Sequence, residues 1–105
     1  MKLYIAILDE VPDNIVPNLV EHSILLADRA FTDNEEYKNW FRFSFKKVNV
    51  RVNRKEFEKI KALPLVYLGH ENHTLGGEKC CAIVCPMARE LLPNVLKCAK
   101  LWSPK

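Results

Sequence analysis

Lys2-Leu-Tyr-Ile-Ala-Ile-Leu8 is the stretch that decides the fold of this 105-residue chain. After its first residue the segment is short and continuously apolar, which is typical of a central strand covered on both faces. A chain of 105 residues suits one domain, and a domain of this size buries roughly two-thirds of the surface that its unfolded chain exposes. We therefore expect a single domain, residues 1–105, built around this strand.

An amphipathic helix is expected directly after the strand. Asp9-Glu-Val-Pro-Asp-Asn14 is a turn in which Asp13 or Asn14 can cap a helix, and Pro17 still lies in the tolerated first turn. At 100° per residue, the apolar face of a helix ending near residue 30 consists of Val16, Leu19, Val20, Ser23, Leu26, Ala27 and Ala30. His22 lies at the margin of this face, where a purely structural histidine is as good an interpretation as a functional one.

A second helix is expected to begin at Thr32-Asp-Asn-Glu35, which has the form of a capping box, and to run through about Phe45. Its buried face would consist of Tyr37, Trp40, Phe41 and Ser44. Phe43 projects to the opposite side, beside Arg42 and Lys46. An exposed aromatic ring among basic residues can stack on a nucleobase, although a single ring is as easily a packing contact with a neighbouring loop.

The middle of the chain predicts a strand and a short helix. Lys47-Val-Asn-Val-Arg-Val-Asn53 alternates strictly between valine and polar residues, which indicates a half-buried strand with a basic outer face. Asn53 and Glu56 offer a cap for a short basic helix, Arg54–Leu63, which ends before Pro64.

The last third predicts two strands, a helix and an edge strand. Leu65–Leu68 and Lys79–Cys85 flank a polar loop, which favours an antiparallel pair. A helix made irregular by Pro93 is expected over Pro86–Val95, and an edge strand over Ala99–Trp102. The order of elements is an α/β or α+β pattern, and we expect an α/β fold in which helices cover a mixed sheet of four to five strands.

The loop between these two strands is the first candidate site. All three glycines and two of the three histidines of the chain fall within Gly69-His-Glu-Asn-His-Thr-Leu-Gly-Gly-Glu-Lys79. Glycine frees the backbone, and loops on a rigid scaffold are where binding and catalytic groups concentrate. The alternative is that Gly76-Gly77 only turns a hairpin and that the imidazoles are solvated.

Cysteine usage argues against a disulfide framework or a metal site. Cys80, Cys81 and Cys85 lie in an apolar run and are interpreted as small buried hydrophobic residues. A redox pair, or a zinc site completed by His70 and His73, is the alternative, but the spacing contains no C-x-x-C and no paired Cys/His motif. We expect no metal and no other cofactor.

The N-terminus predicts a cytoplasmic protein. It lacks the basic start, the apolar stretch and the small-residue cleavage site of a signal peptide, and no apolar run approaches membrane-spanning length. We therefore expect reduced thiols and no membrane association.

Charge is unevenly distributed along the chain, although the net charge is only +3. Residues 1–36 carry a net −6, residues 38–61 a net +7 and residues 62–105 a net +2. A basic block attracts polyanions, because neutralised phosphates release condensed counterions. The alternative is a solvated Lys/Arg face that maintains solubility.

Several of these features recur together in one known family. They are the opening apolar strand, Asn18-Leu-Val-Glu-His22-Ser23, Trp40-Phe41, Lys46–Val52, the helix before Pro64, the loop containing Thr74, and Pro86 sixteen residues before Trp102. With them the chain resembles, over nearly its whole length, the peptidyl-tRNA hydrolase type II family, enzymes that recycle stalled peptidyl-tRNA. The short form suits a divergent, for example phage-encoded, member.

The resemblance implies catalytic roles for four residues. His22 matches the family's histidine, and His70, next to Glu71, aligns with its loop aspartate. The family's glycine-lysine pair at the start of the first helix is replaced by Asn14-Ile15, so Lys79 is the candidate for the missing positive charge and Glu71 for the missing carboxylate.

Hydrolysis of the ester between peptide and tRNA requires an activated water, stabilisation of the oxyanion and a surface for the tRNA backbone. A histidine suits the first task, especially when a carboxylate such as Glu71 orients it. Backbone N–H groups of the glycine turn, or Lys79, suit the second. The substrate-binding residues implied by this interpretation are Asn18, Thr74, Lys38, Arg42, Lys47, Arg51 and Arg54.

Two other classes of function remain open. One is a catalytically inactive relative that binds tRNA, another nucleic acid or a nucleotide, which the missing lysine at Ile15 favours. The other is a protein-interaction module with opposed acidic and basic faces. Convergence of His22, Glu71 and Lys79 would favour the enzyme. The sequence leaves the oligomeric state open, a homodimer included.

Overall fold

The computed structural model describes residues 1–105 and is built around the expected central strand. Strand β1 (Lys2–Leu8) has the predicted bounds, and every residue from Ile5 to Leu8 is buried. The elements that follow are the 3-10 helix η1 (Asp13–Ile15), α1 (Val16–Ala30), α2 (Glu35–Asn39), the π-helix η2 (Trp40–Ser44), β2 (Lys46–Val52), α3 (Arg54–Lys61), β3 (Val66–Gly69), the 3-10 helix η3 (Leu75–Gly77), β4 (Cys81–Val84), the 3-10 helix η4 (Arg89–Leu91), α4 (Asn94–Lys97) and β5 (Lys100–Leu101).

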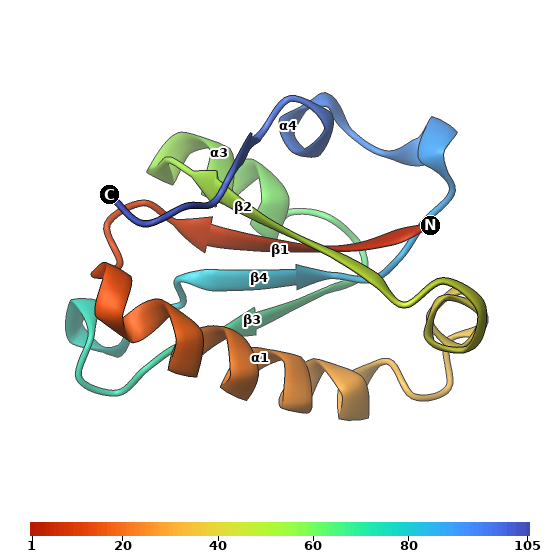
Figure 1. Cartoon of the computed structure of the whole chain (residues 1–105), viewed down its shortest axis with the longest axis horizontal. Helices are drawn as coiled ribbons and strands as arrows, with labels where there is room; N and C mark the ends of the chain where they lie inside the picture. Colours follow the sequence, from red (N-terminus) through yellow and green to blue (C-terminus); the bar gives the residue numbers. More distant parts are fainter.

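The five strands form one mixed sheet in the order β3-β4-β1-β2-β5. β1 and β2 are parallel, as their long helical connection requires, and the other neighbours are antiparallel. Helix α1 lies against one face of the sheet, whereas α3 and α4 lie over the other (Figure 1). The predicted α/β fold with a mixed sheet is therefore confirmed.

The first helix is confirmed, with a narrower buried stripe than its sequence predicts. Pro17 occupies the first turn of α1, and the buried residues are Val16, Leu19, Ser23 and Ala27. Leu26 is 38% exposed and Ala30 is exposed, so placing these two on the buried face was wrong. His22 is exposed.

The second helix differs from the prediction at both ends. Asn34, not Thr32, is the cap, because its Oδ1 accepts a hydrogen bond of 2.9 Å from the Tyr37 amide. After five residues α2 gives way to a π-turn, closed by the Phe45 amide donating to the Trp40 carbonyl at 2.7 Å. Phe41 is 55% exposed, so placing it on the buried face was wrong.

The remaining elements follow the predicted order with shifted ends. Asn53 and Glu56 form the expected capping box of α3, and Val50 and Val52 of β2 are buried as the alternation predicts. The helix expected over Pro86–Val95 is absent as such: η4 and α4 replace it, and Pro93 caps α4 because a residue without an N–H is tolerated only at a helix start.

Three of the four free cysteines, Cys80, Cys81 and Cys85, are buried as small apolar residues, as predicted. Burial raises the pKa of Cys81 to about 12 and that of Cys85 to about 11, so neither thiol ionises readily as a nucleophile. No helix combines the length and the apolar character needed to cross a membrane.

Candidate functional site

The candidate site begins where α1 touches the end of β3. Gly69 ends β3, and a Cβ atom added there would lie 2.0 Å from Ser23 Oγ and 2.8 Å from Ser23 Cβ. Only glycine permits this approach, because a side chain at position 69 would overlap Ser23, and Ser23 is fully buried and has little room to move. His22 precedes Ser23 in the chain and His70 follows Gly69, so each histidine is the sequence neighbour of one of the two contacting residues.

The helix presents His22 on the flank that faces away from η2. The Ile24 and Asp28 flank of α1 lines a hollow shared with Trp40 and Phe45. At 100° per residue His22 and Asn18 lie on the other flank, and both are exposed. An exposed imidazole on this side is available to a bound substrate.

Residues 70–80 form a compact polar loop. The Thr74 amide donates to the Glu71 carbonyl at 3.1 Å, and the Thr74 carbonyl accepts from the Gly77 amide at 2.9 Å. Gly76 and Gly77 both have positive φ values, 64° and 79°, which explains glycine at each position. The expected hairpin connection between antiparallel strands is confirmed, and Thr74 itself is only 7% exposed.

His70 and Lys79 are the two predicted catalytic residues in direct polar contact. Lys79 Nζ lies 3.1 Å from His70 Nδ1. An ammonium group has no acceptor, so this geometry makes His70 Nδ1 the acceptor and leaves the proton of the neutral ring on Nε2. The pair therefore offers a positive charge and an N–H donor rather than a free base. Glu71 contributes its backbone carbonyl to the loop.

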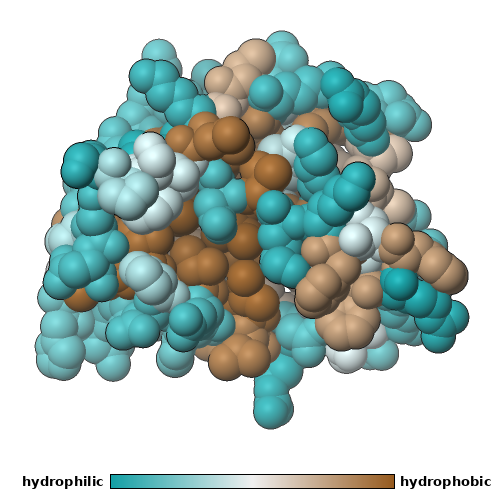
Figure 2. Space-filling view, viewed as in Figure 1, coloured by the Kyte–Doolittle hydropathy of each residue, from teal (hydrophilic) through white to brown (hydrophobic).

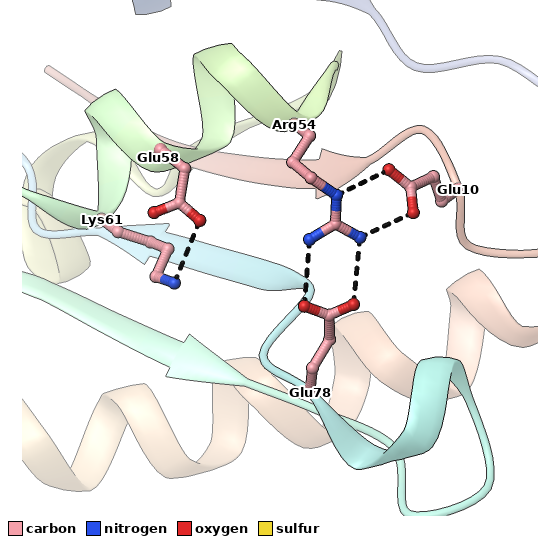
Figure 3. Close-up of polar contacts among 5 residues, drawn as sticks. All are labelled: Glu10, Arg54, Glu58, Lys61 and Glu78. Carbon is pink, nitrogen blue, oxygen red and sulfur yellow. Dashed lines mark hydrogen bonds and ion pairs between the residues drawn. The ribbon is translucent and has the colours of Figure 1, made fainter.

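Arg54 fastens this loop to the rest of the molecule. Its guanidinium group lies between two carboxylates, Glu10 and Glu78, at distances of 2.6–3.0 Å (Figure 3). Glu10 follows β1, Arg54 begins α3 and Glu78 precedes β4, so three segments meet at one side chain. The hydrogen bonds from Arg54 lower the pKa of both carboxyl groups. We refer to these three residues as the Arg54 clamp.

The predicted basic surface is divided in the folded protein. Besides Arg54, Arg51 is also engaged: its Nη2 lies 3.4 Å from Asp13 Oδ1, and its guanidinium group packs over Trp102. Lys38 pairs with Glu35 within α2 at 3.5 Å. Of the predicted tRNA-binding cations, Arg42 and Lys47 form no ion pair with a carboxylate.

His22 is exposed and His70 is partly exposed at the molecular surface. The four principal hollows of the molecule lie elsewhere, and none is lined by His22, His70, Glu71 or Lys79. Small-molecule sites are usually enclosed, whereas a macromolecule can be bound on an open surface. No group of three or more His, Cys, Asp or Glu side chains is arranged to hold a metal ion.

Two parts of this arrangement were not predicted from the sequence. In the Arg54 clamp, Arg54 is 44 positions from Glu10 and 24 from Glu78 in the sequence, so no local sequence pattern predicts these contacts. The Ser23 contact did leave a signal, namely a small polar residue on the apolar face of α1 and a glycine at the end of a strand pattern. No protein-family model matches the sequence, and a search of curated proteins also finds no match.

Proposed function

We propose that this protein hydrolyses the ester bond that joins a peptide, or an N-acylated amino acid, to tRNA, as its resemblance to the peptidyl-tRNA hydrolase type II family implies. The observation that carries the proposal is the contact between Gly69 and Ser23, because it brings the helix turn that bears His22 to the loop that bears His70 and Lys79. The exposed position of His22 also suits a macromolecular substrate.

In the proposed reaction, His22 accepts a proton from water while the water oxygen attacks the ester carbonyl carbon. Negative charge develops on the carbonyl oxygen, and the Lys79 ammonium and the His70 Nε2–H stabilise it. The bond to the terminal ribose then breaks, and the ribose oxygen takes the proton from His22. The products are a peptide with a free carboxyl group and tRNA with a free hydroxyl group.

The test is the release of labelled acyl group from N-acetylated aminoacyl-tRNA. We expect wild-type protein to release it without added metal, and His22→Ala to lower the rate by about 10²–10⁴-fold, as loss of a general base does. His73→Ala is the matched control, because His73 is also exposed but has no assigned role. Equal rates for wild type and His22→Ala, with equal unfolding midpoints, would remove His22 from the mechanism.

A second candidate is a relative that binds tRNA without hydrolysing it. The specific observation that favours it is Ile15, which is half-buried against the core at the place where the family carries a lysine. Binding that weakens steeply with salt, together with no ester cleavage by the wild-type protein, would favour this candidate over the enzyme.

A further inference from the structure

Three phenylalanine side chains are exposed at one end of the molecule. Phe41, Phe43 and Phe45 expose 55%, 77% and 51% of their surfaces. They lie on or directly after η2, and we call them the aromatic ridge. Figure 2 shows hydrophobic surface interleaved with hydrophilic side chains on the side where η2 lies in Figure 1. Single exposed apolar residues are ordinary, but adjacent aromatic rings indicate a binding surface.

The backbone of the ridge is held in an unfavourable conformation. Phe45 has φ 59° and ψ 15°, in the left-handed region, which is unfavourable for a bulky residue. Its ring packs 5.2 Å from Trp40 and 5.3 Å from Phe41, between ring centres, which holds the strained residue in place while half of it remains exposed. π-Turns and strained non-glycine residues of this kind concentrate at functional sites.

Cations surround the rings and have no carboxylate partner. Lys47 Nζ lies 3.4 Å from the centre of the Phe45 ring, and the Arg42 guanidinium carbon lies 5.9 Å from the centre of the Phe43 ring. Lys46 stands in register with Lys2 on the neighbouring strand, a like-charge pairing that is unfavourable by itself. The five ion pairs of the protein involve none of these residues. The cations of the ridge therefore form no ion pair, although Asp28 lines the same hollow as Phe41, Phe45 and Lys47.

We propose that the aromatic ridge binds single-stranded nucleic acid, with Phe43 stacking on an unpaired base and Arg42, Lys46 and Lys47 contacting phosphates. Exposed rings within a positive surface are the combination that single strands require, since duplexes hide the faces of their bases. Phe43 is the most exposed ring. A hollow between α1 and η2, lined by Leu25, Phe41, Phe45 and Lys47 among others, gives a neighbouring base a place to insert. Phenylalanine and arginine are also enriched in protein interfaces, but lysine is depleted there, so Lys46 and Lys47 beside the rings favour nucleic acid over a protein partner.

The ridge is a separate surface from the candidate active site. The ridge lies at the end of β1 where Lys2 pairs with Lys46, and the loop lies at the other end, where Ile7 pairs with Cys81. Lys2 and Ile7 are five residues apart along β1, which corresponds to roughly 17 Å at the rise of a strand. Arg42 and Lys47 are also among the predicted tRNA-binding cations, but binding at the ridge does not require ester hydrolysis. An oligonucleotide without an acyl group tests it alone.

The experiment measures fluorescence anisotropy of labelled 12-nucleotide RNA and DNA single strands and of the matched 12-bp duplexes, and measures co-sedimentation of the protein with vesicles containing phosphatidylserine. We expect single strands to bind more tightly than duplexes at equal phosphate concentration. Phe43→Ala should weaken single-strand binding about 5- to 150-fold, as loss of one stacked base does. Phe43→Trp should retain binding, and Leu91→Ala, at an equally exposed apolar residue outside the ridge, should change nothing.

The charged residues have their own expected effect. A Lys46→Gln/Lys47→Gln variant should flatten the slope of log affinity against log salt by about 1.4, because each phosphate contact to a single strand contributes about 0.7. Equal binding of single strands and duplexes with no effect of Phe43→Ala would overturn the proposal in favour of phosphate attraction alone. Binding to vesicles but not to oligonucleotides, or to neither, would also overturn it.

Discussion

At the residue scale, Gly69 lies so close to Ser23 that a side chain at position 69 has no room. A methyl group at position 69 would overlap the Ser23 hydroxyl, and both residues are buried between α1 and β3. We expect Gly69→Ala to lower the free energy of unfolding by about 1–3 kcal/mol, the usual cost of overpacking a core. Urea unfolding measures this cost.

A double variant tests whether the Ser23 hydroxyl is the group that excludes a side chain at position 69. Ser23 Oγ faces the Cys81 thiol, a weak hydrogen-bonding group, and has no other partner, so Ser23→Ala by itself should leave stability nearly unchanged. In that background Gly69→Ala should cost less than it does in the wild type, because the atom at 2.0 Å is gone. An equal cost in both backgrounds would show that the hydroxyl is not the obstacle.

At the element scale, α3 depends on its cap. The Asn53 side chain accepts from the Glu56 amide at 2.8 Å, and the Glu56 side chain accepts from the Asn53 amide at 2.8 Å. We expect Asn53→Ala to destabilise the protein by about 1 kcal/mol, because buried Phe57 and Ile60 tie this helix to the core. The urea midpoint measures the loss, with Asn18→Ala at an exposed position of α1 as control. An unchanged midpoint for Asn53→Ala would contradict the role of the cap.

Local sequence pattern was sufficient to predict some of the helices and strands but not others. β1, α1 and the cap of α3 were predicted because apolar periodicity and capping residues act within one or two turns. The π-turn at Trp40–Ser44 was not predicted, since its widened hydrogen bond depends on Trp40 being anchored by the Lys46 carbonyl, 2.7 Å from its Nε1. The turn carries two of the three rings of the aromatic ridge, Phe41 and Phe43, and Phe45 follows it.

At the scale of the whole molecule, the Arg54 clamp links stability to pH. Both carboxyl groups have lowered pKa values in the folded state, so they contribute stability above the ordinary glutamate pKa of about 4.3, and this contribution is lost as pH falls through the lowered values. We expect Arg54→Met to be less stable than wild type at pH 7 and the difference to be smaller at pH 3. Urea midpoints at the two pH values test this.

Two checks separate the clamp from a general effect of charge. Lys55→Met removes a neighbouring exposed cation of α3 that has no ion-pair partner, so it should leave the midpoint at pH 7 nearly unchanged. Carboxyl NMR should report a higher pKa of Glu78 in Arg54→Met, because its main hydrogen-bond donor is gone. A stability difference that is the same at both pH values would assign Arg54 a packing role only.

The sequence by itself determined the central strand, the order of elements and the α/β class, because apolar burial and turn chemistry act locally and repeat at fixed periods. It also identified the polar loop and the histidine-bearing helix as the candidate site. Only the tertiary structure decided how the charges of the basic block are used. Arg51 and Arg54 meet carboxylates far away in the chain, whereas Arg42, Lys46 and Lys47 remain unpaired beside exposed rings. Charge pairing depends on distance in space, which no local pattern encodes.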